Sequence, residues 1–477
     1  MLFNSIDFAI FLPIVFVLYW FLTNRNLKLQ NLLIVIASYI FYGWWDWRFL
    51  SLIVFSTIVD FTIGNLLKNE VRVNFRKIYL WISIIVNLGF LGFFKYYNFF
   101  IDSFTEVFSF FGGEISVNSL NIILPVGISF YTFQTLSYTI DVYRKQLEPT
   151  KDIIAFSAFV SFFPQLVAGP IERATNLLPQ FYKRRTFDYN LAIDGLRQIL
   201  WGLFKKVVIA DNCAEYANQI FNNSNDFSGS TLFIGALCFT FQIYGDFSGY
   251  SDIAIGTSRL FGFNLKQNFA FPYFSRDIAE FWRRWHISLS TWFRDYLYIP
   301  LGGSRGSLLK KIRNIFIIFI VSGFWHGANW TFIVWGFLNA LYFLPLMLMN
   351  KNRVNTNLVA ESRIFASFRE IGQMTITFLL TVLAWVFFRA KDVSHAFSYL
   401  DGMFSSSLFH VPEVFDSNVF FLVLGFMVVE WFGRSNKYAI ESIFKVPKIG
   451  RWAFYFLLIA LMFIYTGKEQ EFIYFQF

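Results

Sequence analysis

The chain alternates long apolar segments with short charged loops, and this pattern predicts helices that cross a membrane. A helix of about 20 residues spans a hydrocarbon core of about 30 Å. The apolar segments are residues 1–22, 30–45, 49–67, 78–99, 121–140, 188–221, 231–256, 312–326, 330–349, 371–389, 418–433 and 451–466. We therefore predict an all-α polytopic membrane protein with about 11–12 membrane-spanning helices.

One apolar segment departs from this pattern, because residues 152–170 have basic residues on both sides. We expect it to be re-entrant or to lie at the membrane surface. Irregular backbone is tolerated at membrane depth only where protein or a water-filled cavity surrounds it, so a tunnel or funnel is expected there. We find no internal repeat and no linker rich in Pro, Gly or Ser, and we expect residues 1–477 to form a single domain.

The composition and the charge agree with a membrane protein. Hydrophobic residues make up 56% of the chain and aromatic residues 22%, which is more than soluble domains contain. The net charge of +9 fits cytoplasmic loops rich in Lys and Arg, and we expect no binding to nucleic acid. The alternation of basic loops predicts that both ends of the chain lie outside. The cysteines, Cys213 and Cys238, have no spacing typical of a disulfide framework or a metal site.

Residues 275–335 hold the candidate reaction centre. Apolar residues recur there at spacings of three and four from Ser275, whose hydroxyl can cap a helix, so we predict one amphipathic helix that ends near Pro300. His286 borders its apolar stripe. An uncharged run from Asn314 then leads to His326, which we place about 20 Å above the cytoplasmic boundary.

A histidine within a membrane usually lines a functional pathway. His326 can serve as the general base of an acyl transfer, because neutral imidazole accepts a proton from a hydroxyl. The alternative is a buried histidine that is hydrogen-bonded to a neighbouring helix. For His286 two roles stay open, since it either orients an acyl donor or closes a polar network.

Two charged regions could bind a ligand or serve the structure. The excess of basic residues around Arg283, Arg284, Arg294 and Arg305 fits an anchor to anionic lipid or a site for a phosphorylated cytoplasmic donor. The stretch 244–252, YGDFSGYSD, has no phosphate-loop spacing. Its simplest interpretation is a helix break whose two aspartates pair with arginines.

Five sequence strings, in this order, resemble the membrane-bound O-acyltransferase family, in its bacterial alginate and peptidoglycan O-acetyltransferase branch. The resemblance covers essentially the whole chain, and the teichoic acid D-alanyl transferases are more distantly similar. The strings are LPVGISFYTFQTLSYTIDVYR from Leu124, QLVAGPIER from Gln165, YGDFSGYSDIAIG from Tyr244, FWRRWHISLSTWFRDYLYIPLGG from Phe281 and FWHGANWTFIVWG from Phe324.

The resemblance implies a ring of helices around a thin core, with a cytoplasmic donor cavity that meets an outer funnel. It implies acetyl transfer from cytoplasmic acetyl-CoA, with no bound cofactor or metal, toward a polysaccharide outside the bacterial cytoplasmic (inner) membrane. His326 and His286 match the two histidine motifs of the family, and His326 is the catalytic candidate. The structural or tunnel candidates in these strings are Tyr244, Asp246, Asp252, Trp325 and Asn329.

The terminal segment 467–477 resembles an aromatic motif whose tyrosine carries an acyl group, which makes Tyr474 a possible carrier. The alternative is an aromatic anchor at the membrane surface. Because no esterase-like domain is part of the printed chain, we expect a separate extracytoplasmic acetyltransferase or esterase-like partner. Two other functions remain as alternatives: a transporter of glycan or lipid, and a scaffold of an envelope complex without catalysis.

Overall fold

The structure is a computed structural model that describes residues 1–111, 120, 122–467 and 470–473. These residues form helices, turns and loops, and none of them lies in a β-strand. They pack as two compact units, which are residues 1–192 with 258–265, and residues 193–257 with 266–477. The fold class predicted from the sequence is therefore confirmed. The assignment of residues 1–477 to a single domain stays a prediction.

The first unit contains mostly long apolar helices. They are α1 (Ile6–Val17), which continues into the π-helical turn η1 (Leu18–Leu22), α2 (Leu27–Asp46), α3 (Leu50–Asn69), α4 (Val73–Leu91), α5 (Tyr97–Phe110), α6 (Ile128–Tyr143), α7 (Ile153–Ser161), α8 (Ala174–Leu177) and the 3₁₀ turn η4 (Leu178–Tyr182). The segment 152–170 forms the short helix α7 and the turns that follow it, with most of its side chains buried. Its assignment as re-entrant or interfacial stays a prediction.

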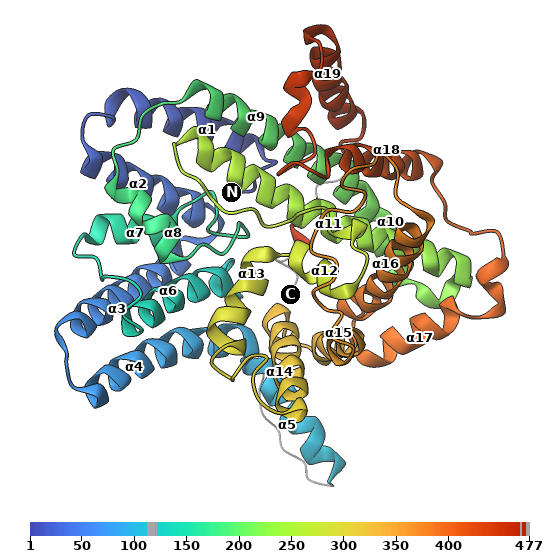
Figure 1. Ribbon diagram of the computed structural model, residues 1–477, viewed down its shortest axis with the longest axis horizontal. Helices are drawn as coiled ribbons and strands as arrows, with labels where there is room; N and C mark the ends of the chain where they lie inside the picture. Colours follow the sequence, from blue (N-terminus) through green and yellow to red (C-terminus); the bar gives the residue numbers. More distant parts are fainter. Residues whose placement is uncertain (112–119, 121, 468–469, 474–477) are drawn as a thin grey trace. The chain divides into compact units, whose positions relative to one another are not determined.

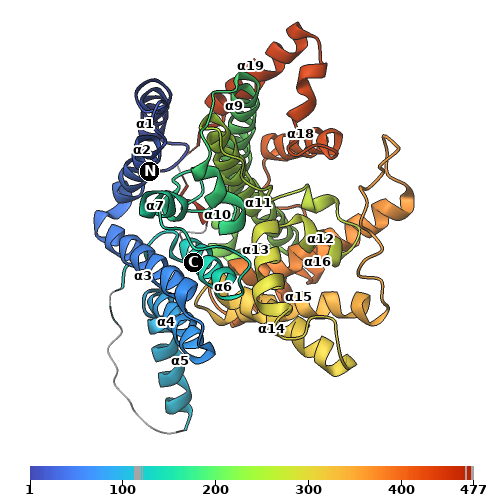
Figure 2. The same cartoon turned by 60° about the vertical axis from the view of Figure 1, so that its left-hand side comes forward.

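A buried aspartate joins three helices of this unit, α3, α4 and α6, which lie side by side (Figure 2). Asp60 on α3 accepts hydrogen bonds from Asn87 Nδ2 on α4 at 2.8 Å and from Thr139 Oγ1 on α6 at 2.8 Å. Ser83 on α4 donates a third bond to it. A carboxyl group away from water is costly unless it is hydrogen-bonded, so this cluster fixes how the three helices pack.

The second unit holds the candidate site. Its helices are α9 (Tyr189–Phe204), whose first residues belong to the first unit, the π-helical turn η5 (Lys205–Ala210), α10 (Asp211–Asn222), α11 (Gly229–Leu260), α12 (Ile278–Arg284), α13 (Ile287–Phe293), the π-helical turn η8 (Arg294–Tyr298), α14 (Leu308–His326), α15 (Trp330–Leu348), α16 (Phe368–Arg389), α17 (Val393–Met403), α18 (Ser417–Gly433) and α19 (Lys448–Ile464). Figure 1 shows α14 next to α15. Helix α17 lies in a region that the sequence assigned to a loop.

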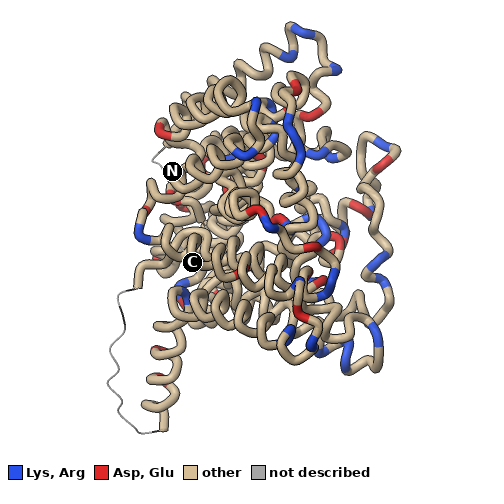
Figure 3. The backbone as a smooth tube through the Cα atoms, turned by 90° about the vertical axis from the view of Figure 1, so that its left-hand side faces the viewer, with Lys and Arg blue, Asp and Glu red and all other residues tan. Residues whose placement is uncertain are grey.

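Length and apolar composition identify membrane-spanning candidates among the described residues. Four helical stretches meet both criteria, 27–69, 73–110, 330–348 and 368–389, and 6–22 and 417–433 are shorter apolar helices. Figure 3 agrees with this picture, since long helical stretches carry few charged residues. The chain is thus a membrane protein with several apolar helices, and the number of about 11–12 spans stays a prediction.

Candidate active site

The expected single amphipathic helix from Ser275 to the region of Pro300 is wrong. Helix α12 ends at Arg284 and α13 begins at Ile287, and His286 between them has φ 43° and ψ 55°. This left-handed conformation interrupts helical hydrogen bonding and turns the chain. The apolar spacing of three and four continues through the break, so the sequence pattern could not reveal it. His286 therefore lies at a corner between two short helices.

The cap of the first short helix also differs from the prediction. Asp277 caps α12, because its Oδ1 accepts the N–H of Glu280 at 2.7 Å. The hydroxyl of Ser275 instead donates to the carbonyl of Pro272 at 2.6 Å. Both residue types cap helices well, and the aspartate two residues later was the better candidate.

His286 is held by a polar network. The side chain is 1% exposed, and its Nδ1 lies 3.1 Å from Oδ1 of Asn268. The hydroxyl of Ser288 donates to the same oxygen at 2.8 Å, and Asn268 Nδ2 donates to Ser251 Oγ at 3.0 Å. Because an amide oxygen only accepts, His286 carries its proton on Nδ1 and leaves the lone pair on Nε2. Asn268 thus orients the imidazole, and no feature of the sequence had indicated it.

His326 is the last residue of α14 and is surrounded by aromatic rings. It is 3% exposed, and the centre of its ring lies 5.2 Å from Trp335 and 5.3 Å from Phe388. The indole of Trp325 lies 4.9 Å from the ring of His326 and 6.0 Å from the ring of His286. The two histidines predicted as catalytic therefore both contact the same indole.

The close packing of α14 against α15 positions these rings. A side chain on Gly323 would collide with the carbonyl of Phe332, and one on Gly336 would collide with the carbonyl of Phe319. The two helices approach so closely because neither position carries a side chain, as is common between membrane helices. Asn329 caps the N-terminus of α15, since its Oδ1 accepts the N–H of Thr331 at 3.0 Å.

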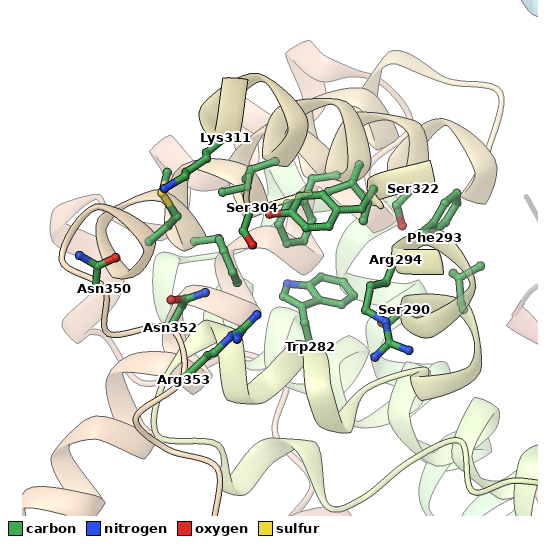
Figure 4. A pocket seen from close by; sticks show the side chains of 17 residues that line it. Trp282, Ser290, Phe293, Arg294, Ser304, Lys311, Ser322, Asn350, Asn352 and Arg353 are labelled. Carbon is green, nitrogen blue, oxygen red and sulfur yellow. The ribbon is translucent and has the colours of Figure 1, made fainter. Parts of the chain in front are cut away.

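A cavity of about 560 Å³ is lined mainly by residues of α12, α13, η8, α14 and α15, and His286 is not among them. Figure 4 shows Lys311 and Arg353 toward one side, Ser322 toward the other and Trp282 between them. Ser322 precedes His326 by four residues on α14, which is one helical turn of about 6 Å. His326 itself does not line this cavity. Trp282 links the cavity to the surroundings of His326. It lines the cavity, and its ring lies 5.6 Å from that of Trp335, which contacts His326.

The four arginines predicted to bind a donor differ in position. Arg294 lines the cavity and pairs with Asp295 at 2.7 Å. Arg283 donates to the carbonyls of Asn352 and Asn355, and Arg284 is paired with Glu280 at 2.8 Å, so both hold the local backbone. Arg305 is exposed and is not among the residues that line the cavity. The lining cations Lys311 and Arg353 were not in the predicted set, although both stand in basic stretches of the sequence.

The stretch 244–252 lies within the uninterrupted helix α11, so the expected helix break is wrong. Its aspartates pair with lysines rather than arginines. Asp246 lies 2.9 Å from Lys206, and Asp252 lies 2.6 Å from Lys205. Glycines in α11 allow this pairing, because Gly249 packs directly against the backbone of α9.

Tyr244 faces a different partner, since its hydroxyl donates to Glu430 of α18. Tyr244, Asp246 and Asp252 thus hold α11 to its neighbours within the second unit. Ser251 of the same stretch instead accepts from Asn268, which contacts His286. Phe247, which follows Asp246 in the sequence, contacts a histidine directly, because its ring lies 4.6 Å from that of His286.

These features define a membrane protein whose described residues are helical or irregular, with two buried histidines and a ligand-sized cavity in the same unit. Residues 149–368 match the model of MBOAT, the membrane-bound O-acyltransferase family. The chain is 41% identical over 455 residues to the probable alginate O-acetylase AlgI of Pseudomonas aeruginosa, which covers 94% of this chain and 84% of that protein. It is 36% identical to a peptidoglycan O-acetyltransferase of Helicobacter pylori, over 84% of this chain and 80% of that protein.

A more distant relative is a teichoic acid D-alanyltransferase of Bacillus subtilis, which is 27% identical over 58% of this chain and 71% of that protein. The chain belongs to the membrane-bound O-acyltransferase family, and it is an acyltransferase. The resemblance inferred from the ordered sequence strings is confirmed. The roles of the individual residues come from their geometry and remain predictions.

Proposed function

We propose that this protein transfers an acetyl group from cytoplasmic acetyl-CoA to a hydroxyl of a cell-envelope or secreted polysaccharide. The names of its relatives, an alginate O-acetylase and a peptidoglycan O-acetyltransferase, support this choice of group and acceptor. The proposed location is the cytoplasmic membrane of a bacterium, with both ends of the chain outside. The excess of basic residues in the loops predicted to face the cytoplasm supports this orientation.

The observation that carries the proposal is the cavity that reaches Ser322, one helical turn before His326 on α14. Its volume of about 560 Å³ lies in the range of small-molecule sites. Lys311 and Arg353 offer positive charge for the phosphates of coenzyme A, while Ile315, Ile318 and Phe343 offer an apolar wall for its arm. The opposite side reaches Ser322, one turn from His326. A thioester that extends from Lys311 and Arg353 toward Ser322 would bring its acetyl group toward His326.

The proposed chemistry needs one base and no covalent enzyme intermediate. His326 accepts the proton of the acceptor hydroxyl while the oxygen attacks the thioester carbonyl. The tetrahedral intermediate collapses, the carbon–sulfur bond breaks, and the proton passes from the imidazolium to the thiolate of coenzyme A. The rings of Trp335 and Phe388 exclude water from His326 and so favour transfer over hydrolysis. His286, oriented by Asn268, is proposed to position the reacting groups.

The terminal tail supports a second route for the acetyl group, from coenzyme A to Tyr474 and then to a partner protein outside. Tyr474 lies outside the described residues, but the residues before it are held near the site. The N–H of Ile473 donates to Asp246 at 2.7 Å, and Lys206 donates to the carbonyl of Gln470 at 3.1 Å. The ring of Phe472 lies 6.3 Å from Phe247, which contacts His286.

The test uses the purified full-length protein in lipid vesicles with acetyl-CoA labelled in the acetyl group. Release of the coenzyme A thiol and the label on added alginate oligosaccharide, on peptidoglycan fragments and on the protein are measured. Thiol release with label on a glycan or on the protein supports the proposal. Movement of glycan across the membrane without thiol release would instead indicate a transporter, and neither event would indicate a scaffold.

The same assay tests the carrier. If Tyr474 carries acetyl, Tyr474→Phe removes the label from the protein and stops delivery to an extracytoplasmic acetyltransferase or esterase-like partner. Tyr465→Phe is the matched control, because it changes another tyrosine of the C-terminal region, just after α19. Unchanged labelling of Tyr474→Phe would exclude the carrier role and leave direct transfer to the glycan.

A further inference from the structure

The first unit contains a cationic cavity that the acyl transfer does not use. It has a volume of about 320 Å³ and lies between η1, the segment that follows η4, and the end of α11. Four basic residues line it, together with one acidic residue, Asp188. The basic residues are Lys183, Arg184, Arg185 and Arg259. Oxygen Oδ1 of Asp188 already accepts the N–H groups of Asn190 and Leu191. The cavity thus carries an excess of positive charge.

Arg185 supplies the strongest indication of a ligand. It is 5% exposed, and its guanidinium donates to neutral oxygens of Gln30 at 3.0 Å, Asn31 at 2.6 Å and the carbonyl of Gln180 at 3.2 Å. The ring of Phe263 lies 4.7 Å from its charge. Among the residues that the structure describes, Arg185 forms no ion pair, and its Nε has no acceptor. A buried cation without a counter-charge is costly, and a bound anion would remove that cost.

An apolar surface continues from the cavity. Trp20 and Leu191 line it, and Leu191 is 47% exposed. The ring of Phe187 lies 5.5 Å from that of Trp20. Phe21 and Leu22, the next residues of η1, are exposed as well. A ligand with an anionic head and an apolar chain fits this combination better than a free anion does.

We propose that this cavity binds the phosphate headgroup of an anionic phospholipid, whose acyl chains lie along Trp20, Phe187 and Leu191. Guanidinium groups bind phosphate oxygens through paired hydrogen bonds, and basic pockets between membrane helices bind anionic lipid headgroups. Arg25 and Lys28 follow η1 in the sequence, and such basic flanks face the cytoplasmic leaflet, which is rich in anionic lipid. This site would anchor the first unit and does not depend on the proposed acyl transfer.

The experiment measures binding of labelled phosphatidylglycerol to the purified full-length protein, with phosphatidylcholine of the same acyl chains as the comparison. The test variant is Lys183→Gln with Arg184→Gln, two exposed residues that line the cavity. The matched control is Arg25→Gln with Lys28→Gln, which removes the same charge from exposed residues outside the lining. We expect the test variant to weaken phosphatidylglycerol binding about tenfold and the control variant to weaken it less than about twofold.

A second measurement addresses Arg185, whose replacement could also disturb folding. Phosphatidylglycerol should raise the Tm of the wild-type protein and should raise that of Arg185→Gln much less, whatever the Tm of the variant without lipid. Inorganic phosphate and coenzyme A should not displace the labelled lipid at equal concentration. Three results would each overturn the proposal. They are equal weakening of binding in the two double variants, equal binding of phosphatidylcholine, and displacement of the labelled lipid by inorganic phosphate or coenzyme A.

Discussion

The surroundings of the two buried histidines differ in kind. His326 lies among the rings of Trp325, Trp335 and Phe388, whereas Nδ1 of His286 lies beside an amide oxygen of a network that includes Ser288. Aromatic faces exclude water, whereas an amide oxygen fixes a proton on the ring nitrogen beside it. These surroundings fit the roles proposed for the two histidines, proton transfer for His326 and positioning for His286.

The shared indole of Trp325 makes this difference useful. It contacts both imidazoles, so it forms part of the surroundings of each. Correct orientation of the reacting groups contributes a large part of the rate of a bimolecular reaction. If His326 is the base, an imidazole at His286 that Asn268 holds in place would help to orient the two substrates. The comparison therefore predicts a larger loss of kcat when His326 is replaced than when the contacts of His286 are removed.

The largest effect is expected for His326→Ala. Removal of a general base costs about 10²- to 10⁴-fold in kcat, and the protein should still be inserted in the membrane. Thiol release from acetyl-CoA measures the loss, and the amount of protein in the membrane fraction serves as the control. Activity within about threefold of the wild type would refute the assignment of His326 as the base.

A smaller effect is expected for Asn268→Ala, which removes the acceptor of His286 Nδ1. The imidazole then loses its orientation, and we expect kcat to fall about tenfold with little change in KM for acetyl-CoA, as for the loss of one buried hydrogen bond. Ser251→Ala is a useful control, because it removes only the next contact in the network. A rise in KM with unchanged kcat would show that Asn268 acts on substrate binding instead.

The fold could be predicted in outline because membrane helices follow from apolar length. The end of α14 at His326 was predicted at the same residue, since the apolar run gives way there to His-Gly-Ala-Asn. The break at His286 could not be predicted, because its left-handed backbone leaves the spacing of apolar residues unchanged. The continuity of α11 was also missed. Glycines that usually signal a break serve there for close packing, as at Gly249.

The site candidates were predicted where a rare residue carries the signal. Histidines next to apolar residues stand out, and both contact Trp325, while their catalytic roles stay predictions. Asn268 lies outside the regular helices, where an asparagine is ordinary, so its role depends on tertiary contacts that only the structure reveals. The cations show the same limit. Lys310 and Lys311 are neighbours in the sequence, yet only Lys311 lines the cavity, because adjacent residues of a helix point in different directions.

This pair of lysines provides the next prediction. Lys311→Gln should raise KM for acetyl-CoA about three- to tenfold with little change in kcat, since it removes one charge-assisted contact with phosphate in a water-exposed position. Lys310→Gln is the matched control, because it removes the same charge from the exposed neighbour on α14. Equal changes for both variants would mean that overall surface charge, and not the cavity, attracts the donor.

The smallest effect is expected at a third histidine, His395, which lines a polar cavity of about 450 Å³ near Ser224 and contacts neither His286 nor His326 in the interactions described above. Burial and the charge of Lys391 lower the pKa of His395 below its ordinary value of 6.5. The unfolded chain then binds more protons below about pH 6.5, so the free energy of unfolding falls as the pH decreases through that range.

His395→Gln should therefore leave acetyl transfer within about twofold of the wild type and slightly reduce the loss of Tm on acidification from about pH 7 to about pH 5. Thermal unfolding of the solubilised protein across that range measures the second effect. A loss of activity as large as that of His326→Ala would break the comparison between the histidines. It would mean that the aromatic rings around His326 do not distinguish the proposed base from a half-buried histidine elsewhere in the second unit.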